Sequence, residues 1–206
     1  DAQLSVFMHV THVVDYSRAF AGGLPYLDAQ VKANVNINDA CNAFYDGSSV
    51  NFFRAAGGCG NTGRIADIIY HEFGHSLHDN AIIEGVGAWD SALSEGVSDY
   101  LAATITGDSG MGRGFKANAK PLREIDPANF ENTWPQDVGE IHHTGIIIAG
   151  ALWDTRKMLM QDKGEAHARQ ATDHIFYQSI RRAVDIPSMY VEALAADDDD
   201  GDLTNG

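Results

Sequence analysis

The sequence HEFGHSLHDN, residues 71–80, decides how this chain is interpreted. His71 and His75 lie four residues apart, and Glu72 directly follows the first of them. On an α-helix, residues four apart project within about 40° of each other, so both imidazole rings would face one point. Two rings placed in this way can hold a metal ion. Glu72, about 100° round the helix, could reach a metal-bound water without binding the metal itself.

The H-E-x-x-H pattern is typical of zinc peptidases, and a catalytic zinc takes three protein ligands and leaves one position for water. In one such arrangement the third ligand is a histidine six residues after the second, but here that position holds Ala81, which excludes it. His78 lies seven residues after His71, about 10 Å along the helix axis, and is too far away to substitute. We therefore predict that His78 is a solvated histidine near the end of the helix.

The third ligand is expected from the next predicted helix, which contains ALSEGVSDY, residues 92–100. Glu95 lies twenty residues after His75, and the connection is short enough for the second helix to fold back on the first. Asp99 follows one turn later, where its carboxylate could accept the free ring N–H of a ligand histidine. Both acids could instead lie on a solvated helix face, but the apolar residues around them favour burial. The sequence therefore predicts Zn²⁺ held by His71, His75 and Glu95, with Asp99 behind them.

Composition limits the classes of partner. The chain has 206 residues, 44% of them hydrophobic, which is enough for one compact unit. Its 29 acidic and 14 basic residues give a net charge of −15, so no nucleic acid and no anionic membrane is expected as a partner. The longest apolar run, residues 145–153, is too short to span a bilayer, and the chain does not start with a basic stretch followed by an apolar one. We expect a soluble mature form or excised domain.

The rest of the chain divides into an N-terminal part with strands and a C-terminal part of helices. Residues 3–21 place apolar side chains at helical spacing, namely Leu4, Phe7, Met8, Val14 and Phe20. Residues 28–54 alternate as at least two strands around the turn DGSS, and residues 107–140 are predicted to be irregular. Further helices are predicted from Thr62 as an N-cap, from Asp90 or Ser91, and over residues 144–161, 165–184 and 187–196.

This order predicts an α+β fold in one domain, residues 1–206. The N-terminal lobe covers about residues 1–82, the helical C-terminal lobe about residues 83–196, and an acidic tail residues 197–206. Cys41 and Cys59 flank a predicted strand and turn, at a spacing that a single disulfide could close. Two unpaired buried thiols are the alternative. A disulfide would favour an oxidising, extracellular setting.

Several stretches resemble known metallopeptidases. The motif HEFGH is followed, after a gap of nineteen residues, by EGVSD, and this arrangement resembles the gluzincin class. The length of the gap matches the thermolysin family. HEFGH together with EIHHTGIIIAGALWDTR, residues 140–156, resembles the fungalysin family still more closely. VFMHVTHVVDY, residues 6–16, resembles the helix that opens the fungalysin catalytic domain, and NAFYDG, residues 42–47, resembles a thermolysin-like edge strand. The resemblance implies a zincin-like catalytic domain, in which a zinc cleft separates a lobe with a mixed sheet from a helical lobe.

The resemblance also implies a role for each candidate residue in peptide hydrolysis. Glu72 would act as general base on a zinc-activated water. His142, or His143 beside it, would stabilise the oxyanion of the transition state from a position just before the next helix. Asn42 and Ala43 would bind the main chain of the substrate, because an edge strand has unpaired N–H and C=O groups. The implied protein is a secreted, monomeric zinc endopeptidase that acts on peptides or proteins and is made with an inhibitory pro-segment.

Two positions depart from the pattern of these families. The tyrosine that helps to stabilise the oxyanion in thermolysin falls on Val86, so this second donor is missing or comes from elsewhere. Asp67 matches a calcium-ligand position, but the glutamate that should join it falls on Thr106. We therefore do not expect calcium at that place.

Two other functions stay open. A zinc aminopeptidase would use the same ligands, but the Gly-x-Met-x-Asn strand typical of that class is not found in this sequence. A catalytically inactive adhesion or calcium-binding module would use the acidic tail, where three aspartates alternate like Ca²⁺ ligands, namely Asp198, Asp200 and Asp202. The glycine there does not sit as in an EF-hand, and the tail could instead be a solvated acidic linker.

Overall fold

The computed structural model describes residues 1–116, 118–198 and 201. Within them the chain forms a mixed α+β fold, as predicted, with a small sheet near the N-terminus and helices through the rest. The helices are α1 (Ala2–Arg18), α2 (Ala66–Ala81), α3 (Ser91–Thr106), α4 (Ile141–Lys163), α5 (Glu165–Ile180) and α6 (Ile186–Asp197), with short 3₁₀ turns η1 (Pro25–Asp28) and η2 (Thr62–Arg64). The strands are β1 (Lys32–Ile37), β2 (Ala43–Tyr45), β3 (Ser49–Phe53), β4 (Gly110–Met111) and β5 (Arg123–Glu124).

The three-stranded sheet has the order β1-β3-β2, with β3 in the centre. β1 runs parallel to β3, whereas β2 and β3 form an antiparallel hairpin in which Phe44 pairs with Asn51. The carboxylate of Asp46 holds the hairpin turn by accepting hydrogen bonds of 2.9 and 2.7 Å from the backbone N–H groups of Ser48 and Ser49. Because β2 pairs with β3 alone, it is an edge strand of the sheet, as predicted.

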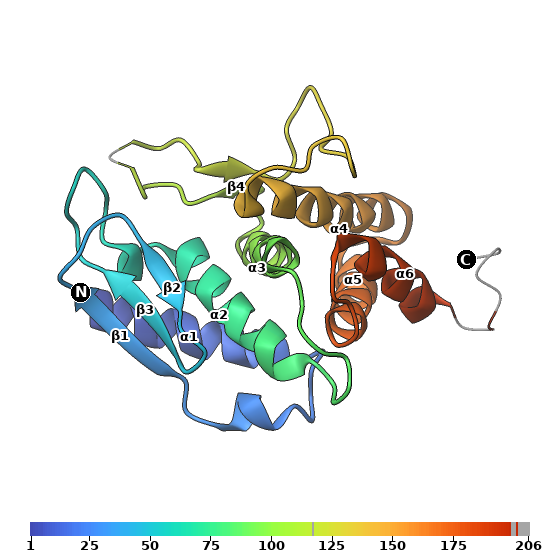
Figure 1. The fold of residues 1–206 in the computed structure, drawn as a ribbon, viewed down its shortest axis with the longest axis horizontal. Coiled ribbons are helices and arrows are strands. Elements are labelled where there is room, and N and C mark those ends of the chain that lie inside the picture. The colour runs from blue at the N-terminus through green and yellow to red at the C-terminus, as the bar shows by residue number, and fades with distance from the viewer. Residues whose placement is uncertain (117, 199–200, 202–206) are drawn as a thin grey trace.

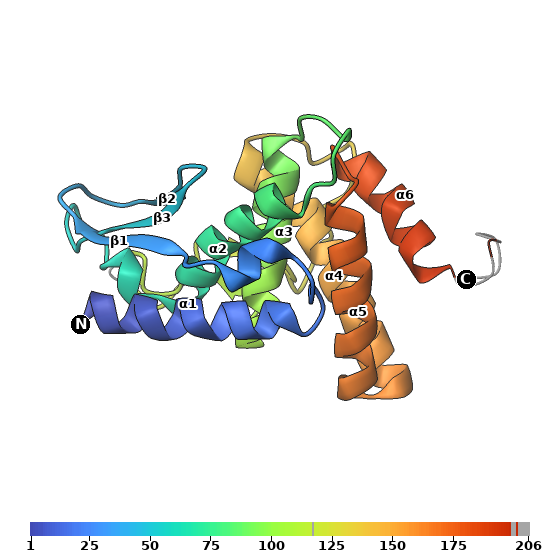
Figure 2. The same cartoon turned by 90° about the horizontal axis from the view of Figure 1, so that it is seen from below.

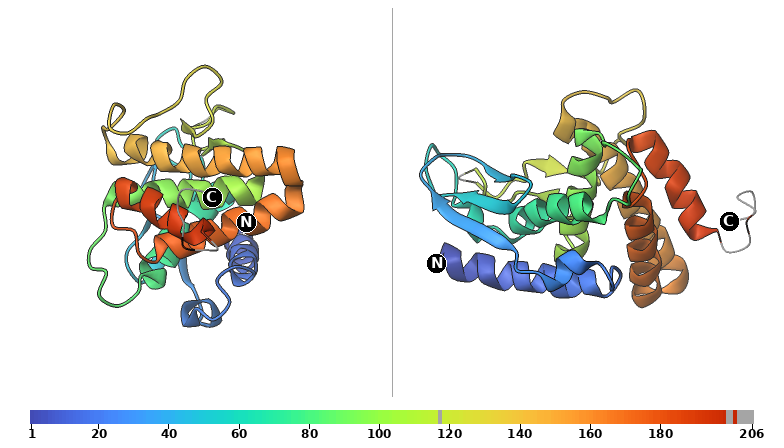
Figure 3. Two further views of the ribbon diagram at one scale, coloured as in Figure 1. Left: turned by 90° about the vertical axis from the view of Figure 1, so that its right-hand side faces the viewer. Right: turned by 60° about the horizontal axis from the view of Figure 1, so that its bottom comes forward.

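Helices cover one face of this sheet and continue away from it. Figure 2 shows α1 and α2 on the same side of the sheet, with α1 running along the base of the molecule. α3 packs between α2 and α4 (Figure 1), and α5 and α6 lie at the end of the molecule farthest from the sheet (Figure 3). No helix in the described part of the chain has both the length and the apolar character that a membrane crossing requires.

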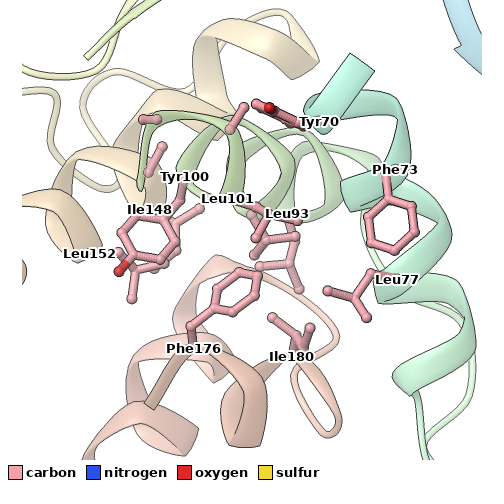
Figure 4. Close-up of a cluster of buried hydrophobic side chains, with 14 of the residues drawn as sticks. Tyr70, Phe73, Leu77, Leu93, Tyr100, Leu101, Ile148, Leu152, Phe176 and Ile180 are labelled. Atoms are coloured by element: carbon pink, nitrogen blue, oxygen red, sulfur yellow. The ribbon is translucent and has the colours of Figure 1, made fainter. Parts of the chain in front are cut away.

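The main hydrophobic core gathers around α3, which begins at the predicted cap residue Asp90. Every residue from 92 to 104 of this helix is buried. Figure 4 shows side chains from α2, α3, α4 and α5 meeting there, among them Phe73, Leu93 and Phe176. Burying a side chain of this size stabilises the fold by about 1.5–3 kcal/mol. The polar side chains that α3 carries on the same turns are therefore buried with them.

Glycines let α3 approach both of its neighbours closely. A Cβ atom on Gly74 of α2 would lie 2.7 Å from the Cα atom of Ser98 in α3. On the other side of α3, a Cβ atom on Gly96 would collide with the backbone carbonyl oxygen of Gly145 in α4. Only glycine allows the helices to meet at this spacing, because any side chain would force them apart. The glycine inside HEFGH thus brings α3 within reach of the two histidines.

The buried face at the start of α1 differs from the predicted one, whereas Val14 is buried and Phe20 packs against the core, in agreement with the prediction. Leu4, Phe7 and Met8 are 59%, 70% and 59% exposed, although all three were assigned to the buried face. The helix instead packs through smaller residues, which are Ala2, Val6, Val13, Val14 and Ser17. Both sets repeat at helical spacing, so periodicity alone could not choose between them. The small side chains fit because α1 lies close to α2 and η2.

Two predicted helix starts are also wrong. Thr62 lies in η2 rather than capping α2, and its hydroxyl accepts a hydrogen bond of 2.9 Å from the N–H of Phe53 and donates one of 3.0 Å to the C=O of Asn42. Thr62 therefore joins the start of α2 to the sheet. α4 begins at residue 141 rather than 144, because the carboxylate of Glu140 caps it by accepting a 3.0 Å hydrogen bond from the N–H of His142.

The predicted disulfide is confirmed, and the acidic tail is described only in part. Cys41 and Cys59 are bonded, with their Cα atoms 5.3 Å apart, and they join the start of β2 to the glycine-rich loop after β3. Asp198 is the C-cap of α6, with extended backbone angles. The other two aspartates considered for calcium, Asp200 and Asp202, lie outside the described residues.

Candidate metal centre

Three side chains from two adjacent helices meet in one place. α2 presents His71 and His75 one turn apart, and α3 presents Glu95 towards both of them. The Nε2 atoms of His71 and His75 are 3.1 Å apart. Oε2 of Glu95 lies 3.1 Å from Nε2 of His71, and its Oε1 lies 3.6 Å from Nε2 of His75. Among the described residues, this is the one group of three or more His, Cys, Asp or Glu side chains close enough together to hold a metal ion.

The spacing of these atoms fits a tetrahedral metal ion. Metal bonds of about 2.0–2.1 Å place neighbouring ligand atoms about 3.3 Å apart in that geometry. The distance between the two Nε2 atoms and the distance from Nε2 of His71 to Oε2 of Glu95, both 3.1 Å, are close to this value, and the other carboxylate oxygen, Oε1, lies 3.6 Å from Nε2 of His75. Two ring nitrogens that face each other so closely can share one proton at most, whereas a metal ion satisfies both. The donor set of two imidazoles and one carboxylate is one that holds zinc in peptidases.

The outer ring nitrogens of both histidines are also held. Nδ1 of His71 lies 2.7 Å from Oδ1 of Asp99, and Nδ1 of His75 lies 2.9 Å from the hydroxyl oxygen of Ser94. Asp99 is completely buried, and it accepts two further hydrogen bonds of 2.7 Å from the guanidinium group of Arg123. These contacts orient both rings with Nε2 towards the centre, which is the usual arrangement around histidines that bind metals.

Burial and neighbouring charges set the protonation of this group. Burial disfavours a charge on His71, but the carboxylates of Asp99 and Glu95 outweigh that effect and hold its pKa well above the usual value. Burial and the charge on His71 hold the pKa of His75 well below its usual value. Burial would raise the pKa of Glu95, yet the hydrogen bond and charge of His71 lower it. One histidine thus carries a proton that a bound metal ion would displace.

Glu72 adjoins the same centre without belonging to the group of three. It lines the cleft together with His71 and His75, and it is only 5% exposed. Burial raises the pKa of Glu72 to about 7, and the charge on His71 opposes this shift only in part. A carboxyl group that titrates near neutral pH can both accept and return a proton. The residue therefore has the properties of a general base and acid.

His142 reaches the centre from the first turn of α4. Its Nε2 atom lies 3.5 Å from Oε2 of Glu95, and its Nδ1 atom lies 2.6 Å from Oε1 of Glu140. Glu140 thereby orients the ring as well as capping the helix. Of the two adjacent histidines, His142 lines the cleft over the metal centre and His143 does not. Both lie inside the helix rather than just before it, which corrects the predicted position.

A cleft of about 500 Å³ runs over the centre. β2 forms one wall, and Ala43 on this strand and Asn42 directly before it line the cleft together with residues of α2 and α3. Two larger hollows lie between α1 and β1 and between α5 and the end of α6, but no cluster of metal-binding side chains occurs there among the described residues. The fold thus brings the candidate substrate strand and the candidate metal ligands to one cleft.

Other positions considered from the sequence lie away from the centre. The two carboxylate oxygens of Asp67 accept backbone hydrogen bonds of 2.8 Å from Ile68 and 2.7 Å from Gly112, so they tie α2 to the segment at β4. Val86, the position where an oxyanion donor would be expected, does not line the cleft. Trp89, three residues later, does line it.

The prediction for His78 is wrong. Its side chain is completely buried, and neither ring nitrogen has a hydrogen-bond partner among the described residues. The ring of Trp89 covers it, with the ring centres 5.2 Å apart. Burial lowers the pKa of His78 to about 4, so the ring is neutral. The prediction failed because the loop that covers this end of α2 has no periodic pattern from which its path could be inferred.

Three residues around the centre were not predicted, namely Ser94, Arg123 and Glu140. Ser94 directly precedes Glu95, so its place near the ligands could have been inferred from the helix. Glu140 could have been suspected because acidic residues often precede helices. Arg123 gave no signal, because it lies on a two-residue strand within the segment predicted to be irregular.

Comparison with known proteins bears on the fold. No family model matches the sequence, and no curated protein matches it. Among solved structures, the fold is similar to one described as the precursor of protealysin, a metalloproteinase from Serratia proteamaculans. The TM-score is 0.69 at 16% sequence identity, and the match covers 95% of this chain and 72% of that chain. The chain has a metallopeptidase fold. At this identity the likeness describes the fold, and the roles of single residues rest on their own geometry.

Proposed function

We propose that this protein is a zinc-dependent endopeptidase with a zincin-like cleft. The observation that carries the proposal is the arrangement of His71, His75 and Glu95, in which each pair of side chains approaches to within 3.1 to 3.6 Å. Two imidazoles and one carboxylate leave a fourth tetrahedral position open, as hydrolysis requires. Asp99 and Ser94 support the ligands from behind. A zinc ion held there would lower the pKa of a water molecule and polarise the carbonyl group of a peptide.

Glu72 serves as the general base in this proposal. Its carboxylate adjoins the ligands in the cleft, close enough to the open metal position to take a proton from the attacking water. The same carboxyl group can then give that proton to the amine that leaves. The proton therefore moves between the water and the leaving amine through a single side chain.

His142 stabilises the negative charge that develops on the carbonyl oxygen. Its Nε2 atom points to the centre, 3.5 Å from Oε2 of Glu95, and its other ring nitrogen is held by Glu140 at 2.6 Å. A donor fixed in this way needs little reorganisation during the reaction. His142 therefore fits this role better than His143, which does not line the cleft.

The substrate main chain binds to the free edge of β2. The backbone C=O groups of Asn42 and Phe44 face β3, because they accept hydrogen bonds from the N–H of Phe53 and from the side-chain amide of Asn51. Alternate residues of a strand direct their backbone groups to opposite sides, so the N–H and C=O of Ala43 face the cleft. An extended peptide can add to this edge as a further strand. The exposed side chain of Asn42 is available beside it.

We propose an extracellular setting for this activity. The disulfide between Cys41 and Cys59 supports it, because such bonds persist mainly in oxidising compartments. We further propose that the protein acts as a monomer on peptide or protein substrates and that a pro-segment inhibits it before maturation.

The proposal is tested with a Glu72→Gln variant and a peptide blocked at both ends. We expect about one zinc ion per chain in both proteins after dialysis, cleavage of the blocked peptide by the wild type, and a loss of at least about a hundredfold in kcat for the variant. Retained hydrolysis by the Glu72→Gln protein would rule out its role as general base. Cleavage of a free-amine peptide alone would identify an aminopeptidase, and calcium without zinc would favour a binding module.

A further inference from the structure

We propose that Asp79, Tyr45 and Trp89 form a subsite for a basic side chain of the substrate, either lysine or arginine. This inference rests on the proposed peptidase function and names the class of substrate that the cleft selects. All three residues line the cleft over the metal centre. They come from three separate segments: the end of α2, the edge strand β2 and the loop before α3. We refer to them below as the Asp79 subsite.

Asp79 offers a carboxylate oxygen for a cation. The hydroxyl group of Tyr45 donates a 3.0 Å hydrogen bond to Oδ2 of Asp79, which fixes the orientation of the carboxylate. The other oxygen, Oδ1, has neither a hydrogen bond nor an ion pair within the described part of the chain. The side chain is partly exposed in the cleft, so a charged ligand can reach it from solvent.

Trp89 supplies an aromatic wall of the same cleft. Its ring is half-buried and packs on the buried ring of His78, with the ring centres 5.2 Å apart. A ring supported from behind keeps a fixed face towards the cleft. The stem of a lysine or arginine can pack on an indole ring, and its cationic head is attracted by the ring electrons. Acid and indole together therefore suit a long basic side chain better than an apolar or acidic one.

The charges around the Asp79 subsite also favour a cation. No lysine or arginine occurs among the described residues that line the cleft, and the negative charge that remains there is that of Asp79, since a zinc ion would offset Glu72 and Glu95. Asp79 also lies in the last turn of α2, where the exposed carbonyl groups give the helix a negative end. The net charge of −15 adds a field that draws basic peptides towards the protein.

The position of Asp79 along α2 indicates which residue of the substrate the Asp79 subsite binds. Asp79 follows His75 by four residues, so it lies about 6 Å further along the axis of α2. An extended peptide advances about 3.3 Å per residue. A side chain that reaches Asp79 therefore belongs to a residue about two positions from the cleaved bond. A separate hollow lined by Leu122 and Phe130 lies beyond His142 and would receive residues on the other side of that bond.

The test compares kcat/KM for blocked peptides that carry arginine, lysine, leucine or glutamate in turn at each position near one cleaved bond. We expect the wild type to prefer arginine or lysine over leucine by about tenfold at one position, and over glutamate by more. Asp79→Asn keeps an acceptor for Tyr45 but removes the charge, so it should abolish most of this preference by lowering kcat/KM for the arginine and lysine peptides far more than for the leucine peptide. Trp89→Leu should reduce the preference several-fold.

A matched control is Asp28→Asn, which removes the same charge from a side chain that is 83% exposed and lies outside the cleft. It should retain the full preference. Equal cleavage of the arginine, leucine and glutamate peptides by the wild type would overturn the subsite and leave the peptidase function intact. An equal loss of kcat/KM for the arginine and leucine peptides in Asp79→Asn would also overturn it, because Asp79 would then support the cleft itself. Failure of the zinc-loaded wild type to cleave any peptide would refute the peptidase function and the subsite together.

Discussion

His71 is fixed through both of its ring nitrogens. Nε2 faces His75 and Glu95 at 3.1 Å, and Nδ1 faces Asp99 at 2.7 Å. Asp99 in turn lies against the guanidinium group of Arg123, so a completely buried carboxylate has a cation on each side. A buried charge is tolerated when it is paired and hydrogen-bonded in this way. The orientation of the His71 ring thus depends on an arginine from a distant segment of the chain.

His78 predicts a specific response of stability to pH. Burial lowers its folded-state pKa to about 4, whereas the unfolded ring has a pKa of about 6.5. The unfolded chain therefore binds a proton before the folded chain does, so stability is full above pH 6.5 and falls as the pH drops towards 4. At pH 5 this group alone should cost about 2 kcal/mol. His78→Leu should lose less stability than the wild type between pH 7.5 and 5, measured by urea unfolding.

A suitable control is His174→Leu, because His174 lies exposed on α5. It should lose as much stability as the wild type over the same pH range. An equal loss for His78→Leu would show that a proton can enter the folded site without cost. That result would contradict the tight cover that Trp89 provides.

The sequence was sufficient to predict which three side chains meet at the candidate metal centre and insufficient to predict the residues that support them. His71, His75 and Glu95 follow from helical spacing and the gap between two helices, and the structure brings all three together. Arg123 could not be predicted, because its contact with Asp99 depends on the path of a long loop. The rule that links periodicity to position applies within helices and strands, and it gives no position for a side chain in an irregular segment.

At the scale of elements, the close contact between α2 and α3 determines whether Glu95 can reach the histidines. Gly74→Ala should push the helices apart, because the new Cβ would lie 2.7 Å from the backbone of Ser98. We expect the variant to lose about 1–3 kcal/mol of stability, despite the better helix propensity of alanine, and to bind zinc more weakly. Urea unfolding and a zinc titration would measure the two effects.

Gly139→Ala is a matched control for this change. A Cβ atom there would meet only the ring of His143 at 3.5 Å, which is an ordinary contact. Its stability should stay within about 0.5 kcal/mol of the wild type. Unchanged zinc affinity in Gly74→Ala would mean that Glu95 reaches the histidines without the close helix approach.

The buried side of a helix was predicted correctly where the sequence has one apolar stripe, and incorrectly where it has two. α3 was predicted because Leu93, Val97 and Leu101 share one side and a cap precedes them, and all three are buried. α1 was predicted as a helix, but the side chains expected to be buried at its start are exposed, since Phe7 belongs to a second apolar stripe that lies in solvent. Which of two such stripes is buried depends on the element that the helix packs against, and the sequence of the helix alone does not specify that element.

At the scale of the whole molecule, the candidate site exists only when four distant segments meet. β2, α2, α3 and the start of α4 each contribute to one cleft. Because a metal ion would join α2 to α3, its binding free energy would add to the stability of the folded chain. Zinc at a hundred times its dissociation constant would contribute about 2.7 kcal/mol. Chelation should therefore lower Tm by roughly 5–10 °C, measured by calorimetry.

Adding back one metal at a time after chelation distinguishes this centre from any calcium site. Zinc should restore Tm after chelation, and calcium should not, because two imidazoles suit zinc whereas calcium prefers oxygen ligands. Glu95→Gln weakens the centre and should reduce the response of Tm to chelation and to zinc. If calcium alone restored Tm, or if Glu95→Gln responded as the wild type does, the stabilising ion would lie elsewhere. The link between α2 and α3 would then be held by packing around Gly74 rather than by a metal.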